Sequence, residues 1–140
     1  MANVAAPIEL LKNVPLFARV DDRGLKLLAG TFTERSFKEG AQLTTEGQGA
    51  AGFFVIESGA ALVTVDGEER RSLGPGDYYG EIALVDGGAR TASITATSDG
   101  NAYGMAAWQF RPLVEEDPTI AWSVLEALAA RVRQIEANPC

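Results

Sequence analysis

Glycine-containing turns divide the central part of the chain into short apolar segments, and this spacing restricts the fold more than any other feature. The segments recur about every ten residues and are rich in β-branched and aromatic residues, as strands are. Asp66-Gly67 separates two of them and favours a two-residue hairpin turn. The candidate strands are Thr31–Phe37, Ala41–Thr45, Gly52–Glu57, Ala60–Val65, Arg70–Leu73, Thr91–Ser98 and Asn101–Ala106. This pattern predicts a mainly β barrel, sandwich or jelly roll.

Helical patterns lie on both sides of these strands. In the N-terminal part, Val14-Pro15 separates two helical segments, and Asp21 and Asp22 stand where the second helix is expected to begin. We therefore expect one domain over residues 1–140. Its parts would be helices at about 7–30, strands at about 31–107 and helices at about 108–137.

The C-terminal region predicts a short helix, Trp108–Glu116, closed by Asp117-Pro118, and a longer helix from Thr119 to about Ala137. Apolar residues of the longer helix are spaced three, four and three apart, as in a coiled-coil seam. They are Leu125, Leu128, Val132 and Ile135. Two heptads cannot hold a free coiled coil. The seam therefore covers either the β body or a partner helix, and the second interpretation allows a homodimer through this helix.

Two residue types exclude several kinds of chemistry. The chain has no histidine, so it has no His-ligated metal site and no Ser–His or Cys–His nucleophile pair. Its one cysteine, Cys140, excludes an internal disulfide and a Cys-rich metal site. No pair of carboxylates stands out for acid–base catalysis. We expect neither catalytic residues nor a metal, and binding is the simplest remaining role.

The charge and the apolar runs bear on partners and location. The net charge of −7 disfavours non-specific nucleic-acid binding and an anionic membrane surface. Apolar runs are far shorter than the roughly 18 residues that span a bilayer, and no targeting segment is visible. We expect a cytoplasmic protein without a membrane partner.

The segment from Asp77 to Ser93 differs from its surroundings. It lies among strands, yet Glu81–Val85 favours one helical turn after a glycine, which exposes backbone N–H groups suited to an anion. Arg90 follows nine residues after Glu81 and offers a bidentate fork for a phosphate. A carboxylate such as Glu81 accepts hydrogen bonds from a sugar hydroxyl. Together these features predict a pocket for a nucleotide monophosphate.

Gly80-Glu81-Ile82-Ala83-Leu84, followed after five residues by Arg90-Thr91-Ala92, resembles the phosphate-binding cassette of cyclic nucleotide-binding domains. The resemblance extends over nearly the whole chain, including the final helices. Its flanking parts are Pro15-Leu16-Phe17, Phe37-Lys38-Glu39-Gly40, Phe54-Val55-Ile56-Glu57-Ser58-Gly59 and Leu73-Gly74-Pro75-Gly76-Asp77. It implies a double-stranded β-helix, a jelly-roll-like β-roll, with N-terminal helices and a long C-terminal helix.

The resemblance also implies roles for the cassette residues. Arg90 would grip the phosphate, and Glu81 would accept from the ribose 2′-hydroxyl, with Gly80 allowing the close approach. Backbone N–H groups near Ile82, Ala83, Arg90 and Thr91 would complete the cradle, Ala92 would leave room for it, and Leu73 and Ile82 would pack near the base. Thr91 would contact either the phosphate or a purine edge, or serve only as a strand residue.

The element that closes over the base falls at residues 131–136 in this family pattern. Ile135 and Glu136 stand where bacterial activators carry hydroxyl residues. Glu136 could accept from the adenine amino group or from guanine N–H groups. Cyclic AMP is the favoured ligand on the family's bacterial members, and cyclic GMP is the alternative. No other cofactor is implied.

Plainer structural interpretations accompany these roles. Glu81 and Arg90 could form only an ion pair, or Glu81 could be only a first-turn acid that complements the helix dipole. Tyr78 and Tyr79 are expected to pack in the roll, and Trp108 and Trp122 in the core. Acidic residues Glu115, Glu116 and Asp117 are expected to form a solvated rim.

The sequence thus predicts a sensor that binds a cyclic nucleotide and signals to a protein partner through its C-terminal helix. The few residues after Ile135 leave no room for a recognition helix, so direct DNA binding is not expected. One alternative is an interaction module that keeps the roll without binding nucleotide. Another is the sensor domain of a longer regulator.

Overall fold

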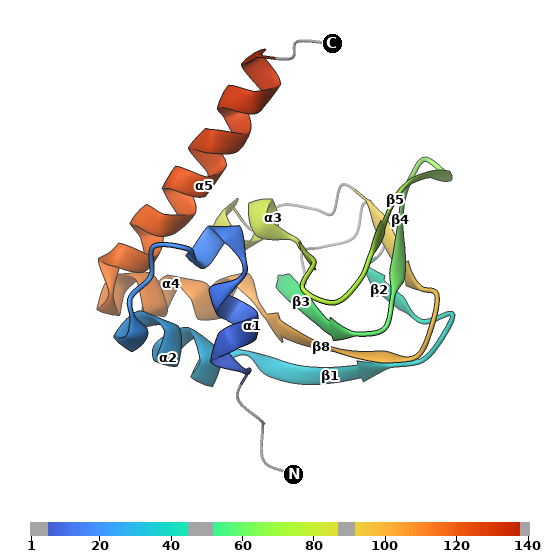
Figure 1. The fold of residues 1–140 in the computed structure, drawn as a ribbon, viewed down its shortest axis with the longest axis horizontal. Helices are drawn as coiled ribbons and strands as arrows, with labels where there is room; N and C mark the ends of the chain where they lie inside the picture. The colour runs from blue at the N-terminus through green and yellow to red at the C-terminus, as the bar shows by residue number, and fades with distance from the viewer. Residues whose placement is uncertain (1–5, 45–51, 87–91, 138–140) are drawn as a thin grey trace.

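Two four-stranded antiparallel sheets form the centre of the computed structural model, which describes residues 6–44, 52–86 and 92–137 (Figure 1). One sheet has the order β1-β8-β3-β6 and the other β2-β7-β4-β5. The strands are β1 (Thr33–Phe37), β2 (Gln42–Thr44), β3 (Phe53–Ser58), β4 (Ala61–Val65), β5 (Glu68–Leu73), β6 (Tyr78–Tyr79), β7 (Ser93–Ala96) and β8 (Gly100–Met105). Buried clusters draw residues from both sheets, as a β-roll requires.

The strands predicted from the sequence are confirmed, with ends that differ by one or two residues. The β4–β5 hairpin turns at Asp66 and Gly67, whose φ angles of 53° and 80° are the left-handed values that this turn needs. The sequence did not predict β6. Its two residues are too few to form a pattern, and only pairing with β3 makes them a strand.

The helices flank the roll as expected. They are α1 (Ile8–Lys12), the 3₁₀ helix η1 (Pro15–Phe17), α2 (Asp22–Thr31), α3 (Glu81–Asp86), α4 (Ala107–Glu116) and α5 (Pro118–Ala137). The Asp21 side chain caps α2 by accepting from the Gly24 N–H at 2.9 Å. Pro118 begins α5, where its missing N–H and fixed φ suit a first helical turn.

An aromatic cluster joins the N-terminal helices to the first sheet. The Phe53 ring lies 5.8 Å from Phe17, 6.1 Å from Phe32 and 5.7 Å from Tyr78, measured between centroids. The three phenylalanines are almost completely buried, so η1 and the end of α2 are fixed against β3.

The fully buried residues of α5 all lie in its first half, and its distal end projects beyond the roll (Figure 1). Ile120, Ser123 and Val124 form its buried face. Leu125, Val132 and Ile135 of the predicted seam are 52%, 55% and 65% exposed, and Leu128 is partly buried. The interpretation that the seam covers the β body is therefore wrong for most of its length.

Three burial predictions are also wrong. Trp108 and Trp122 were expected in the core, but they are 77% and 67% exposed. The buried faces of α4 and α5 are formed by other residues, so neither tryptophan faces the roll. Asp117 was expected on a solvated rim, but it is buried. Its carboxylate accepts from the Thr119 N–H and hydroxyl at the start of α5.

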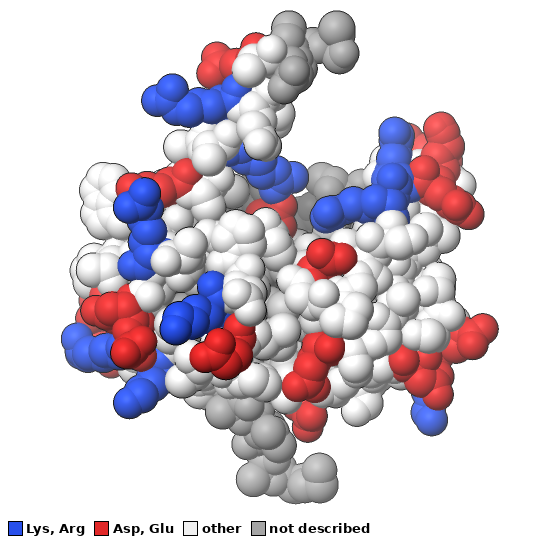
Figure 2. All heavy atoms as spheres, viewed as in Figure 1, with Lys and Arg blue, Asp and Glu red and all other residues white. Residues whose placement is uncertain are grey.

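Charged side chains of both signs are scattered over the face shown in Figure 2, and the described residues there form no broad basic surface. Across residues 6–44, 52–86 and 92–137, no helix combines the length and apolar character needed to span a membrane. The same ranges contain no group of three or more Cys, Asp or Glu residues placed to hold a metal ion.

Gly100 provides a test of the close approach between β8 and the turn after β3. A Cβ atom there would lie 2.2 Å from the Ser58 carbonyl oxygen. We expect Gly100→Ala to lower the free energy of unfolding by about 1–3 kcal/mol, because the backbone must shift to relieve the clash. Chemical denaturation measures this change.

Gly30→Ala is the matched control, since no atom lies within 4 Å of the added methyl group. It lies in the last turn of α2, so we expect a gain of up to about 1 kcal/mol. Equal effects of the two substitutions would contradict this description of the β8 start.

Candidate functional site

A tight turn between β5 and β6 positions the start of the cassette. The Gly74 N–H donates to the Asp77 carboxylate at 2.8 Å, and Gly76 has a left-handed φ of 88°. Two backbone bonds then tie the turn to β3: Gly76 N–H donates to the Ile56 carbonyl at 2.7 Å, and Ile56 N–H donates to the Asp77 carbonyl at 2.8 Å. These bonds fix the position of the turn relative to β3, and β6 begins directly after it.

The two tyrosines of β6 hold the next residues against the roll. Tyr79 lies opposite Phe54 with ring centroids 6.4 Å apart, and Tyr78 packs on Phe53. Their predicted role in roll packing is confirmed. Burial raises the pKa of the Tyr78 phenol, and the nearby Glu81 carboxylate raises it further, while Arg131 acts in the opposite direction.

Gly80 links β6 to the short helix α3. Its φ of 98° is a left-handed value that favours glycine, so the change of direction from strand to helix depends on this residue. The Leu84 N–H donates to the Gly80 carbonyl at 2.9 Å and closes the first turn of α3. The helical turn predicted within the β region is therefore confirmed, and Ile82 and Ala83 both lie in it.

Glu81 is one of the few buried charged residues among those described, with 7% of its surface exposed. Its Oε1 accepts from Nη1 of Arg131 on α5. Its Oε2 is buried without a hydrogen-bond partner among the described residues. An unpaired buried carboxylate oxygen is costly, so this atom is poised to accept a hydrogen bond from a ligand.

Sequence reasoning missed the Arg131 contact. It considered Arg90 as the ion-pair partner of Glu81, and Arg90 and Thr91 lie outside the described residues. The signal for Arg131 was present, because the segment expected to close over the base begins at that residue. Only the path of α5 beside α3 brings the guanidinium to Glu81.

Leu73 and Ala92 meet in one buried cluster inside the roll. Both are 1% exposed, and Tyr79 packs against the cluster that contains them. Leu73 ends β5 and Ala92 stands just before β7, so residues far apart in the chain line the same interior next to the cassette. That Leu73 and Ala92 lie near a ligand stays a prediction.

Glu136 lies apart from this cluster. It is exposed on the projecting end of α5. The other predicted ligand residues all belong to the segment from Leu73 to Ala92 and not to α5. The contact between Glu136 and a base stays a prediction.

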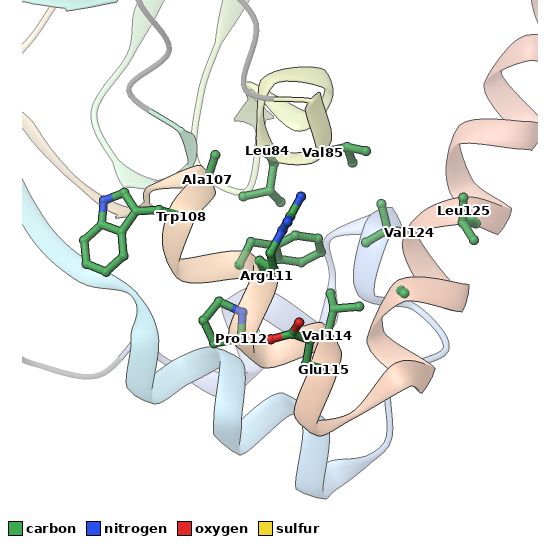
Figure 3. Close-up of a pocket in the computed structure, with 12 residues that line it drawn as sticks. Leu84, Val85, Ala107, Trp108, Arg111, Pro112, Val114, Glu115, Val124 and Leu125 are labelled. Atoms are coloured by element: carbon green, nitrogen blue, oxygen red, sulfur yellow. The ribbon is translucent and has the colours of Figure 1, made fainter.

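Two grooves flank α5 near the cassette. Leu84 and Val85 of α3, Trp108 and Arg111 of α4, and Val124 and Leu125 of α5 line an apolar groove of about 710 Å³ (Figure 3). The groove runs along the gap between the three helices.

The second groove has a volume of about 490 Å³ and lies between η1 and α5. Tyr78, Glu81 and Arg131 are among its lining residues. Glu81 therefore faces a space bounded by α5.

Comparison with known proteins gives the class of this domain. The model of the cyclic nucleotide-binding domain family matches residues 34–117, which is more than half of the chain. The chain therefore belongs to the cyclic nucleotide-binding domain family. The match includes the β-roll except for Thr33, the first residue of β1, and it also includes α3 and α4.

The chain is also similar to parts of longer curated proteins. The chain is 31% identical over 125 residues to an uncharacterized NTE family protein of Mycobacterium tuberculosis, covering 89% of this chain and 21% of that protein. It is 36% identical over 88 residues to the cAMP-dependent protein kinase regulatory subunit of Yarrowia lipolytica, covering 61% and 24%. The chain thus spans about a fifth to a quarter of these curated relatives.

A solved structure has the same fold. The N-terminal domain of a transcriptional regulator from Streptomyces coelicolor superimposes with a TM-score of 0.79 at 29% identity, covering 89% of this chain and 93% of that one. The agreement confirms the predicted β-roll with flanking helices.

Proposed function

We propose that this domain is a sensor that binds a 3′,5′-cyclic nucleotide in the cassette formed by residues 80–92. The buried, unpartnered Oε2 of Glu81 carries the proposal, because a ribose hydroxyl would satisfy it. Gly80 gives the strand-to-helix change that places Glu81 at the start of α3. Arg90 would bind the phosphate, with N–H groups of Ile82, Ala83, Arg90 and Thr91 beside it. Leu73 and Ala92 would bound the apolar side.

Cyclic AMP is the favoured ligand over cyclic GMP. Support comes from the relative that is named a cAMP-dependent protein kinase regulatory subunit. Glu136 is the candidate acceptor for the adenine amino group once α5 lies over the base. A guanine would present N–H donors to the same carboxylate, so comparison of the two nucleotides tests this preference.

Ligand binding would act on α5. The apolar groove between α3, α4 and α5 exposes Val85 and Leu125 to 51% and 52% (Figure 3). A movement of α5 toward α3 would bury this surface, at roughly 25 cal/mol for each Å². A ligand that fixes α3 would therefore favour one placement of α5 and present or hide a surface for a protein partner. The proposed role needs no catalytic residue, metal or DNA contact. The cytoplasmic location of the protein stays a prediction.

Substitution of Arg90 tests the phosphate site. We expect Arg90→Ala to weaken cyclic AMP binding by on the order of 10- to 100-fold, since a charge-assisted bond of about 1.5–3 kcal/mol is lost. Arg90→Lys should recover only part of the affinity, because lysine lacks the bidentate fork. Titration calorimetry with cyclic AMP and cyclic GMP gives the dissociation constants.

Arg70→Ala is the control, since Arg70 is exposed on β5 and is expected to bind cyclic AMP as the wild type does. Wild-type protein that binds neither nucleotide would support an interaction module that keeps the roll without a ligand. Equal affinities in wild type and Arg90→Ala would place the ligand elsewhere.

We infer that a second copy covers the exposed seam of α5. Leu125, Val132 and Ile135 repeat at coiled-coil spacing on a helix that projects from the body (Figure 1). Two such helices would bury each other's seam, whereas a single copy leaves it in water. The same arrangement would bring Glu136 of one copy near α5 of the other copy.

Val132→Glu is expected to raise the dimer dissociation constant at least about tenfold, because an unpaired carboxylate would be buried in the seam. Ala137→Glu adds the same charge on another side of α5 and should leave the dimer intact. Sedimentation equilibrium over a range of protein concentrations measures both. A wild-type protein that stays monomeric at every concentration would contradict the homodimer.

A further inference from the structure

The two oxygens of the Glu81 carboxylate have different surroundings. Oε1 accepts from Nη1 of Arg131, whereas Oε2 is buried without a partner among the described residues. The Glu81 side chain is 10% exposed and that of Arg131 is 52% exposed. One carboxylate therefore already holds α5 and still has a free accepting atom.

The first half of α5 is tied to a different part of the molecule. The Ser123 hydroxyl donates to the Leu16 carbonyl at 2.8 Å and accepts from the Arg19 N–H at 3.2 Å. Arg19 also pairs with Glu126 at 3.1 Å between Nε and Oε1. These contacts join the first half of α5 to η1 and the residues that follow it, so the two are expected to move together.

Arg131 joins this unit to the cassette. It lies two turns beyond Ser123, where α5 has left the buried face formed by Ile120, Ser123 and Val124. Its guanidinium compensates the charge of a carboxylate that burial would otherwise penalise. A displacement of α5 would therefore leave Glu81 with two unpartnered oxygens.

We propose that Arg131 is the positioning residue that couples occupancy of the cassette to the placement of α5. This inference rests on the proposed function. A ribose hydroxyl can donate to Oε2 while Arg131 keeps Oε1, so ligand and helix bind the same carboxylate without competing. Arg131 orients Glu81 for the ligand, and the ligand in turn fixes the group that holds Arg131. Because such coupling is reciprocal, loss of Arg131 lowers ligand affinity as well as helix response.

Arg131→Gln tests the proposal in the full chain. We expect its affinity for cyclic AMP to fall by about 5- to 150-fold, the range of ordinary coupling between sites. Arg131→Lys should recover part of the loss, since it keeps the charge. Arg133→Gln is the matched control, because Arg133 is exposed on the same helix, and it should bind as wild type does.

A distance measurement separates coupling from simple stabilisation. Spin labels at Glu68→Cys on the β4–β5 hairpin and Ala137→Cys on α5, with Cys140→Ser, report where the helix lies. We expect cyclic AMP to change this distance distribution in the wild-type background and in Arg133→Gln, and to leave it unchanged in Arg131→Gln. A purely structural role would lower the free energy of unfolding while keeping the ligand-dependent change.

The outcomes separate the role of Arg131 from the existence of the cyclic nucleotide site. Wild-type affinity together with a wild-type distance change in Arg131→Gln would overturn the role of Arg131 and leave the cyclic nucleotide site standing. Failure of the unsubstituted protein to bind cyclic AMP or cyclic GMP would overturn the proposed function and this inference with it.

Discussion

The packing of Phe53 against Phe17, Phe32 and Tyr78 is the contact on which the rest of the structure depends. It fixes the N-terminal helices to the first sheet and holds β6 in place. Gly80 and Glu81 follow β6 directly, so an apolar cluster positions the start of the cassette. The strand side of the site is therefore built on the packed core.

The helix side of the site has a different character. Glu81 is buried at the start of a short helix, and its charge is compensated by an arginine from α5 rather than from its own sheet. The apolar groove beside this pair leaves Val85 and Leu125 in water. A closely packed strand side and an incompletely packed helix side would suit a domain whose ligand changes the placement of one helix.

The net charge of −7 is compatible with a ligand that is an anion. Binding of a single phosphate depends on the groups within a few ångströms, since charges on the surface are screened over about 10 Å at ordinary ionic strength. A pocket that combines one arginine with backbone N–H groups can therefore work in an acidic protein. The overall charge instead disfavours partners that are polyanions.

Local chemistry explains which parts of the fold were predictable. Asp66-Gly67, Asp21 and Pro118 act through their own backbone and nearest neighbours, so the hairpin and both helix starts follow from the sequence. Strand β6 exists only because β3 pairs with it, and the exposure of Trp108 and Trp122 depends on which elements pack against their helices. Asp117 was misjudged for a related reason: its bond to Thr119 is local, but its carboxylate also lies beside Gly24 of α2, a neighbour that only the fold brings to it.

Turn residues, helix starts and cassette spacing were enough to predict the β-roll with flanking helices and the resemblance to the family. Turn residues and cassette spacing are local properties of the chain, and they survive without knowledge of long-range contacts. Long-range packing, in contrast, determines that Arg131 holds Glu81, that Oε2 has no hydrogen-bond partner among the described residues and that most of the α5 seam is exposed. These depend on the direction of one helix, which is set by contacts between residues more than a hundred positions apart, such as Leu16 and Ser123.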